Sequence, residues 1–217
     1  MTYFVLIGDL VDSRGLPDRA GVQARLRAEI ETLNLALGSG FAAPLRLTAG
    51  DELQVLTLDP PPLVDVLVSI SDAVLPAGLS WGLGRGPIST ALDPDVSLVD
   101  GPCFHRAREA VESAKRSGRW VDVRGFPGVG GVAIPAILNL VGALRDGWTA
   151  RQAEVVQAAR GRLQVEVAEE LGVHASTVSR TLAAAHLDQI LEGEAAARAL
   201  LAAVRDADAH TPTESAP

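Results

Sequence analysis

The sequence predicts a two-part chain: a mixed α/β domain of the α+β, ferredoxin-like class, followed by an all-α domain with a helix-turn-helix. The first half alternates apolar runs and amphipathic segments in the order strand, helix, strand, strand, helix, strand, with a further helix and strand appended. A Gly- and Pro-rich segment at 126–136 then interrupts this pattern. Beyond it the sequence is helical, and a small residue, a glycine and an apolar residue fall at helix-turn-helix spacing.

Composition limits the functions that are open to the chain. Its 217 residues are 47% hydrophobic and 21% charged, which suits one medium core and a second, smaller one. No apolar run approaches the ~20 residues that cross a bilayer, and no targeting stretch follows Met1, so we expect a cytoplasmic protein. A single cysteine, Cys103, excludes an internal disulfide. The net charge of -8 means that any binding to DNA requires a local patch.

The first predicted strand ends in an acidic segment, IGDLVDSR. Residues 3–7 form a continuous apolar run that stops at Gly8, which is typical of a strand buried on both faces. Asp9 and Asp12 follow this run directly. Apolar residues then recur at three- and four-residue steps over 22–37 and predict an amphipathic helix.

A second acidic segment, TAGDELQ, joins two strands. Residues 44–48 and 53–58 alternate apolar and polar side chains and predict a hairpin, with Asp51 and Glu52 in its turn. The ferredoxin-like order places the first and third strands side by side, so the carboxylates of Asp9 and Asp51 are expected to converge. Converged carboxylates repel each other, and Mg²⁺ or Mn²⁺ carrying phosphates is the cation that we expect between them.

The remaining elements of the first domain continue the alternation. They are a helix from prolines 60–62 to about Leu75, a strand at 79–85, a helix at 101–116 and a strand at 120–123. Glycines 82, 84 and 86 indicate close approach by a neighbour or a ligand. The helix that opens with Gly101 and Pro102 favours an anion near His105; a surface histidine on a polar helix face is the alternative.

The acidic segments also carry a family resemblance. IGDLVDS and LTAGDELQ resemble the two metal-binding stretches of class III nucleotide cyclases, and GDE resembles the signature turn of the diguanylate cyclases that share their fold. Together with GLGRG and GPCFHRAREA they resemble the SatD family over roughly residues 2–125. The resemblance implies a nucleotide-cyclase-like sheet. The candidate metal ligands are Asp9, Asp12 and Asp51, and the candidate nucleotide- or phosphate-binding residues are Gly50, Glu52, His105, Arg106 and Arg108.

The helix at 101–116 departs from the cyclase pattern. Cyclases carry an asparagine there and, one turn later, an arginine that stabilises the transition state; this chain has His105 and Glu109 instead. Arg106 and Arg108 are displaced in register, and a helix turns ~100° per residue. We therefore expect a non-catalytic or degenerate cyclase-like domain; a Mg²⁺-dependent nucleotide-processing enzyme is the alternative. The aspartates taken singly are also typical helix caps and turn residues.

The C-terminal part resembles the winged and sigma-like helix-turn-helix domains of bacterial regulators. Ala168, Gly172 and Val178 carry the spacing. Phosphate contacts are expected from Arg160, Arg162 and His186, although acids outnumber arginines between 149 and 206. The alternative is a helix-turn-helix that serves only in packing or dimerisation and does not bind DNA. The residues expected to face a major groove are His174, Ser176, Thr177, Ser179 and Arg180.

These observations divide the chain into an α/β domain (1–126), a linker with a connecting helix (127–148), a helix-turn-helix domain with a C-terminal helix (149–206) and a disordered tail (207–217). The apolar stripe of 187–204 suits a dimer interface. We expect a homodimeric DNA-binding regulator that senses a nucleotide or phosphate ligand and has no membrane partner.

Overall fold

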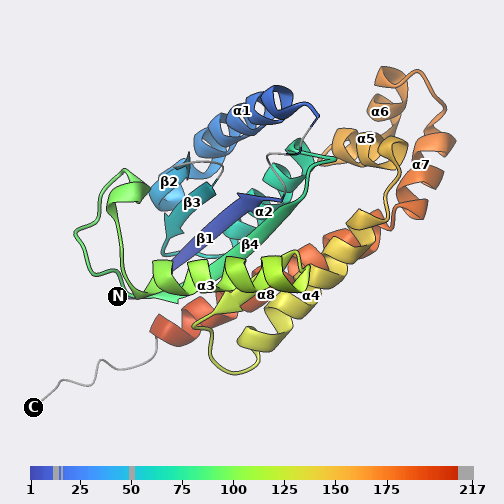
Figure 1. Ribbon diagram of the computed structural model, residues 1–217. Helices are drawn as coiled ribbons and strands as arrows, with labels where there is room; N and C mark the ends of the chain where they lie inside the picture. Colours follow the sequence, from blue (N-terminus) through green and yellow to red (C-terminus); the bar gives the residue numbers. More distant parts are fainter. Residues whose placement is uncertain (12–14, 16, 49–51, 210–217) are drawn as a thin grey trace, which may run out of the picture.

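The computed structural model describes residues 1–11, 15, 17–48 and 52–209, and it confirms the mixed α/β class (Figure 1). Its five strands form one sheet in the order β2-β3-β1-β4-β5. The central strand β1 is antiparallel to both β3 and β4, whereas β5 is parallel to β4. The strands are β1 (Tyr3–Leu10), β2 (Phe41–Leu47), β3 (Glu52–Thr57), β4 (Leu79–Gly86) and β5 (Val121–Arg124).

Eight α-helices and two short 3-10 helices, Gly38–Gly40 and Val96–Leu98, are found in the described residues. None of these helices is long and apolar enough to cross a membrane. The α-helices are α1 (Arg19–Leu37), α2 (Pro62–Ala73), α3 (Pro102–Ser117), α4 (Gly130–Asp146), α5 (Ala150–Ala159), α6 (Gln164–Glu170), α7 (Ala175–Ala184) and α8 (Leu187–Ala209).

Strand β1 runs further than its apolar pattern predicts. It continues through Gly8 to Leu10, so Asp9 lies within the strand rather than after it. The glycine is required there because a Cβ at Gly8 would lie 2.3 Å from Cζ3 of Trp81 on the neighbouring strand. In the same way Glu52, expected in the hairpin turn, is the first residue of β3 and pairs with Asp9.

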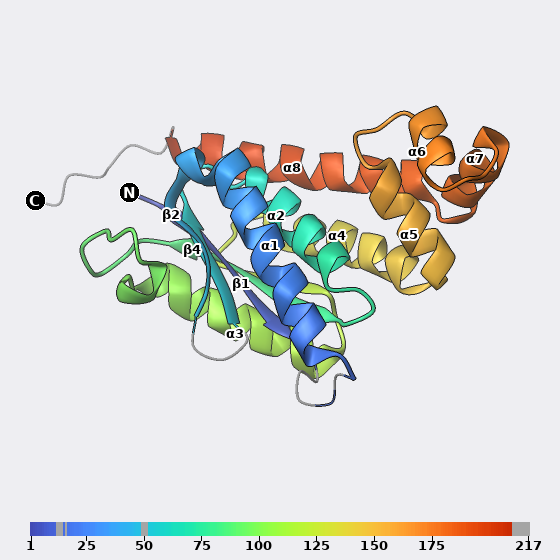
Figure 2. The ribbon, with the colours of Figure 1, turned by 90° about the horizontal axis from the view of Figure 1, so that it is seen from above.

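Helices cover both faces of the sheet (Figure 2). Alternate residues of β1 supply the two cores: Tyr3, Val5 and Ile7 pack toward α3, whereas the intervening side chains pack toward α1 and α2. Helix α3 lies directly on β4, since a Cβ at Gly82 would come 2.2 Å from the carbonyl oxygen of Ala107. The close neighbour that the β4 glycines accommodate is therefore α3.

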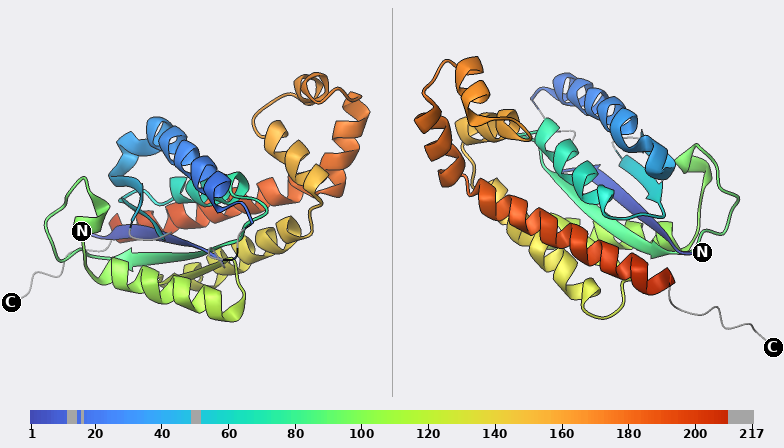
Figure 3. Two further views of the ribbon diagram at one scale, coloured as in Figure 1. Left: turned by 45° about the horizontal axis from the view of Figure 1, so that its top comes forward. Right: turned by 180° about the vertical axis from the view of Figure 1, so that it is seen from behind.

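The core of the sheet continues into α4 and α8. Ile134 and Leu138 of α4, with Leu201 and Val204 of α8, belong to the same hydrophobic cluster as the strands. The predicted linker at 127–148 thus contains a 17-residue packed helix, and α8 runs beside it behind the sheet (Figure 3). The apolar side chains of α8 that suited a dimer interface are largely used within the chain.

Helices α5, α6 and α7 form a separate small core at the far end of α8, away from the sheet (Figures 1 and 2). The turn between α6 and α7 contains Gly172, whose φ is 63°, a value that favours glycine. Val178 and Leu182 are the buried residues of α7. Helix α8 runs from this core along the sheet domain (Figure 2).

Candidate functional site

Two of the predicted acidic residues meet at the end of β1. Asp9 and Glu52 are direct partners in the β1–β3 ladder. The carboxylate of Asp9 forms an ion pair with Nζ of Lys115 at 2.6 Å, and both side chains are about one-third exposed. Burial alone would lower the pKa of Lys115, but the hydrogen bond and charge of Asp9, with the charge of Glu112, raise it above its usual value. Lys115 therefore places a positive charge next to Asp9.

The structure describes only one of the three predicted metal ligands. Asp12 and Asp51, and Gly50 of the nucleotide set, lie outside the described residues. Within the described ranges no group of three or more His, Cys, Asp or Glu side chains is placed to hold a metal ion. Asp9 is the described member of the set, and its carboxylate is paired with the Lys115 ammonium.

The other predicted phosphate-binding residues lie at the opposite end of α3. His105 and Lys115 are ten positions apart on this helix, which corresponds to ~15 Å. His105 contacts Asp100 (Nε2 to Oδ1, 3.4 Å), and Arg106 donates from Nη1 to the carbonyl oxygen of Arg85 at 2.7 Å. Arg108 is exposed on the same turn. These three residues are consequently not brought together with Glu52.

A cleft of about 900 Å³ opens beside Asp9 instead. Its walls come from the end of β1, the end of α3, the 75–80 segment and the α4–α5 junction. The side chains that matter for its chemistry are Asp9, Lys115, Arg119, Trp120, Arg145, Asp146 and Trp148. This volume lies within the ~300–1,000 Å³ range of small-molecule sites.

Arg145 is the most unusual residue of this cleft. Its guanidinium carbon lies 4.9 Å from the ring centroid of Trp120 and 5.1 Å from that of Trp148. The side chain is only 5% exposed, and Nη2 forms an ion pair of 2.6 Å with Asp72. Nη1 has no hydrogen-bond partner in the described part of the chain.

A buried ionic network continues from this pair. Asp72 of α2 also contacts Nε of Arg160 at 2.8 Å, and Arg160 contacts Glu194 of α8 at 3.0 Å. Arg198 adds a contact to Glu194 at 3.6 Å. The network joins α2, α4, the end of α5 and α8, so Arg160 is held inside the protein and is not available for the phosphate contact expected of it.

Sequence reasoning missed this network and the cleft. A signal was present in the helical spacing, because Arg145 continues the buried stripe Ile134, Leu138, Val141 of α4. Glu194 likewise falls four residues after the buried Ile190 of α8. A charged residue on an apolar stripe predicts a buried ion pair.

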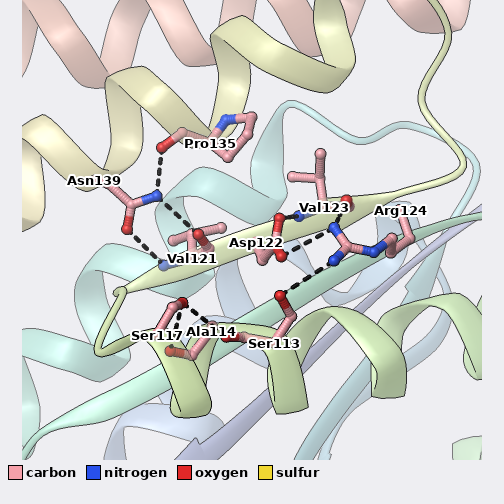
Figure 4. A network of polar contacts seen from close by, with 9 residues as sticks. All are labelled: Ser113, Ala114, Ser117, Val121, Asp122, Val123, Arg124, Pro135 and Asn139. Atoms are coloured by element: carbon pink, nitrogen blue, oxygen red, sulfur yellow. Dashed lines mark hydrogen bonds and ion pairs between the residues drawn. The ribbon is translucent and has the colours of Figure 1, made fainter.

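Polar contacts fasten the edge strand β5 to helices on both sides (Figure 4). Asn139 of α4 accepts from the backbone N–H of Val121 at 3.1 Å and donates to its carbonyl oxygen at 2.8 Å. On the α3 side, Arg124 contacts Asp122 at 2.9 Å and Ser113 at 3.1 Å. Burial would raise the pKa of Asp122, but hydrogen bonds from Ser113 and Arg124 lower it overall.

The predicted DNA-facing residues lie at the beginning of α7 and immediately before it. His174, Ser176, Ser179 and Arg180 are exposed, and Thr177 is half-buried. The Nε of Arg180 donates to the carbonyl oxygen of Ser176 at 3.2 Å, which leaves its side chain on the surface. Arg162 forms an ion pair of 2.7 Å with Glu170.

Comparisons with known proteins place the chain in a family. No match was found among curated proteins. The crystal structure of a regulator of polyketide synthase expression from Bifidobacterium adolescentis is 18% identical and aligns with 96% of this chain and 86% of that one, but the TM-score of 0.25 carries no argument about fold or function. The family model of SatD matches residues 3–201, which include the sheet, the cleft and helices α6 and α7; the chain therefore belongs to the SatD family.

Proposed function

We propose that the protein is a DNA-binding transcriptional regulator whose sheet domain senses a nucleotide or phosphate ligand. In this proposal α6 and α7 are a helix-turn-helix and α7 is the helix that reads the major groove. The observation that carries it is the exposed polar face of α7 at the outer end of α8. The recognition helix of a helix-turn-helix enters a major groove ~12 Å wide with its exposed polar residues toward the base edges.

The sheet supports the sensing half of the proposal. Its strand order, with β1 between β3 and β4, is the observation that supports a ferredoxin-like, nucleotide-cyclase-like arrangement in this proposal. This order brings Asp9 and Glu52 to one end, next to a cleft of small-molecule size. We propose Mg²⁺ or Mn²⁺ at Asp9, Asp12 and Asp51 as an accessory to ligand binding.

Helix α8 supplies a route between the two functions. It begins next to α7 and its later turns are buried in the core of the sheet. A ligand that favours one position of the sheet relative to α8 would therefore change the position of α7. We further propose a homodimer, which two-fold DNA sites require, with the exposed Val132, Leu140 and Leu191 of α4 and α8 at its interface.

The test is selection of DNA sequences from a random library with the purified chain, followed by titration at fixed salt. Arg180→Ala should weaken binding to the selected sequence about tenfold or more, because one specific base contact contributes ~1–3 kcal/mol. Arg27→Ala, at an exposed position of α1, is the matched control and should leave the affinity unchanged. Failure to enrich any sequence, or full affinity of Arg180→Ala, would remove DNA reading by α7.

The second candidate function is a Mg²⁺-dependent enzyme that processes nucleotides. The adjacent positions of Asp9 and Glu52 favour it, because paired carboxylates hold catalytic metals. Incubation of ATP or GTP with Mg²⁺ and the purified chain, analysed by chromatography, distinguishes the two. Turnover that Asp9→Asn abolishes would make this the primary function.

A further inference from the structure

We infer that the cleft beside Asp9 binds a small molecule in which a flat ring is joined to an anionic group. The inference rests on the proposed function for the role of this molecule as an effector, but the binding itself is independent of DNA. The cleft is about 900 Å³ in volume, enough for a molecule of mononucleotide size.

The aromatic part of the cleft specifies the ring. Trp120 and Trp148 line it, and each is only half-buried. The guanidinium of Arg145 lies over both rings and contacts one face of each. Half-buried indoles that are already ordered offer a flat ligand apolar contact and stacking at little entropic cost.

The charged part of the cleft specifies the anion. Lys115 is neutralised by Asp9, but Arg119, four residues later, has no side-chain partner among the described residues. Arg145 is paired with Asp72 and its Nη1 is buried, so among the described lining residues Arg119 is the cation that remains for a ligand. The carboxylates and cations of the lining balance overall, but within the described ranges Arg119 is a cation without a carboxylate partner beside the tryptophans, and a carboxylate or phosphate would satisfy it.

The position of the cleft explains how its ligand would be sensed. One wall belongs to β1 and α3 of the sheet domain, and the other to α5, which packs against α7. Arg145 contributes to the cleft and also to the ionic network beneath it. A ligand that touches both walls would stabilise one position of α5 and α7 relative to the sheet.

Calorimetry with four probes tests the chemistry. AMP carries a ring and a phosphate, and indole-3-acetate a ring and a carboxylate; adenosine and inorganic phosphate carry one feature each. At least one joined molecule should bind tenfold or more tightly than both single-feature probes. Tighter binding of AMP identifies a phosphate ligand, and tighter binding of indole-3-acetate a carboxylate ligand. If neither joined molecule binds, the inference is wrong.

Two variants locate the site. Arg119→Gln should weaken binding of the preferred probe at least tenfold, and Ala150→Trp, which places an indole in the cleft, should abolish it. Arg116→Gln is the matched control, because Arg116 is exposed in the last turn of α3 and does not line the cleft. Unchanged binding in Arg119→Gln and Ala150→Trp would overturn the assignment to this cleft.

DNA titrations with and without the preferred probe separate the inference from the proposed function. A probe that binds in the cleft and shifts DNA affinity by fivefold or more supports both. Binding in the cleft with no DNA binding at all leaves the site intact and removes the regulator. Normal DNA binding with no affinity for AMP or indole-3-acetate supports the regulator and removes the ligand site.

Discussion

Two groups of charged residues in this protein differ in physical role and in whether the sequence predicts them. Asp9 and Glu52 lie in acidic motifs of the sequence at the end of β1, where the partly exposed Lys115 joins them. Asp72, Arg145, Arg160 and Glu194 are collected from four helices, and the two carboxylates are nearly buried. Motif residues near solvent are available for ligands, whereas the buried group holds the sheet domain and the helical part together.

The largest effect is expected from Asp72→Ala. The substitution leaves Arg145 and Arg160 as buried cations without their shared carboxylate, so the free energy of unfolding should fall by about 3–5 kcal/mol. Urea unfolding at neutral pH measures it. Asp65→Ala, which removes the exposed partner of Arg198, should cost about 1 kcal/mol or less. An equal loss of unfolding free energy in Asp72→Ala and Asp65→Ala would show that the buried ion pairs contribute no more to stability than the exposed one.

Asp122→Asn should give an intermediate effect with a characteristic pH dependence. The lowered pKa of Asp122 means that its charge stabilises the fold at pH values above its ordinary 3.8, and this contribution is lost as pH falls through the lowered value. The variant should be about 1–2 kcal/mol less stable at neutral pH. The difference should shrink as urea unfolding is repeated at increasingly acidic pH.

The outcome that contradicts this prediction is a constant difference at every pH. Glu109→Gln, at an exposed position on α3, provides the matched control. Its stability should stay within about 0.5 kcal/mol of the parent protein, as for most surface substitutions.

The smallest effect on stability is expected from Asp9→Asn. Its ion pair with Lys115 is about one-third exposed, so the free energy of unfolding should change by about 1 kcal/mol or less. Thermal unfolding with ATP or GTP, with and without Mg²⁺, should nevertheless show a loss of any metal-dependent stabilisation. A loss of several kcal/mol would instead place Asp9 with the structural network.

The sequence was informative where structure depends on near neighbours. The apolar period of α1, the glycines of β4 and the spacing around Gly172 all predicted elements that the structure contains. The boundaries were less accurate because they depend on other elements. Strand β1 continues past its apolar run because Asp9 and Leu10 still pair with neighbouring strands, and the connecting helix expected within 127–148 is the longer helix α4, which packs on the sheet.

The candidate sites also divide into features that the sequence predicts and features that depend on the packing of other elements. Strand order and two acidic segments predicted that Asp9 and Asp51 converge; the structure brings the ends of β1 and β3 together and pairs Asp9 with Glu52, whereas Asp51 lies outside the described residues. The separation of His105 from these residues was not predicted, because it depends on the direction in which α3 crosses the sheet. Lys115, near the other end of α3, is the residue that reaches Asp9.

The sequence by itself determined the mixed α/β class, the core-facing stripes and the α6–α7 spacing, because each is encoded in residues a few positions apart. Only the tertiary structure decided which charges meet. The buried network consists of Asp72, Arg145, Arg160 and Glu194. Its first and last members are more than a hundred positions apart in the sequence, so no helical or strand periodicity relates them. Their ion pairs form because packing of α4 and α8 on the sheet excludes water around them, and a buried charge must find a partner.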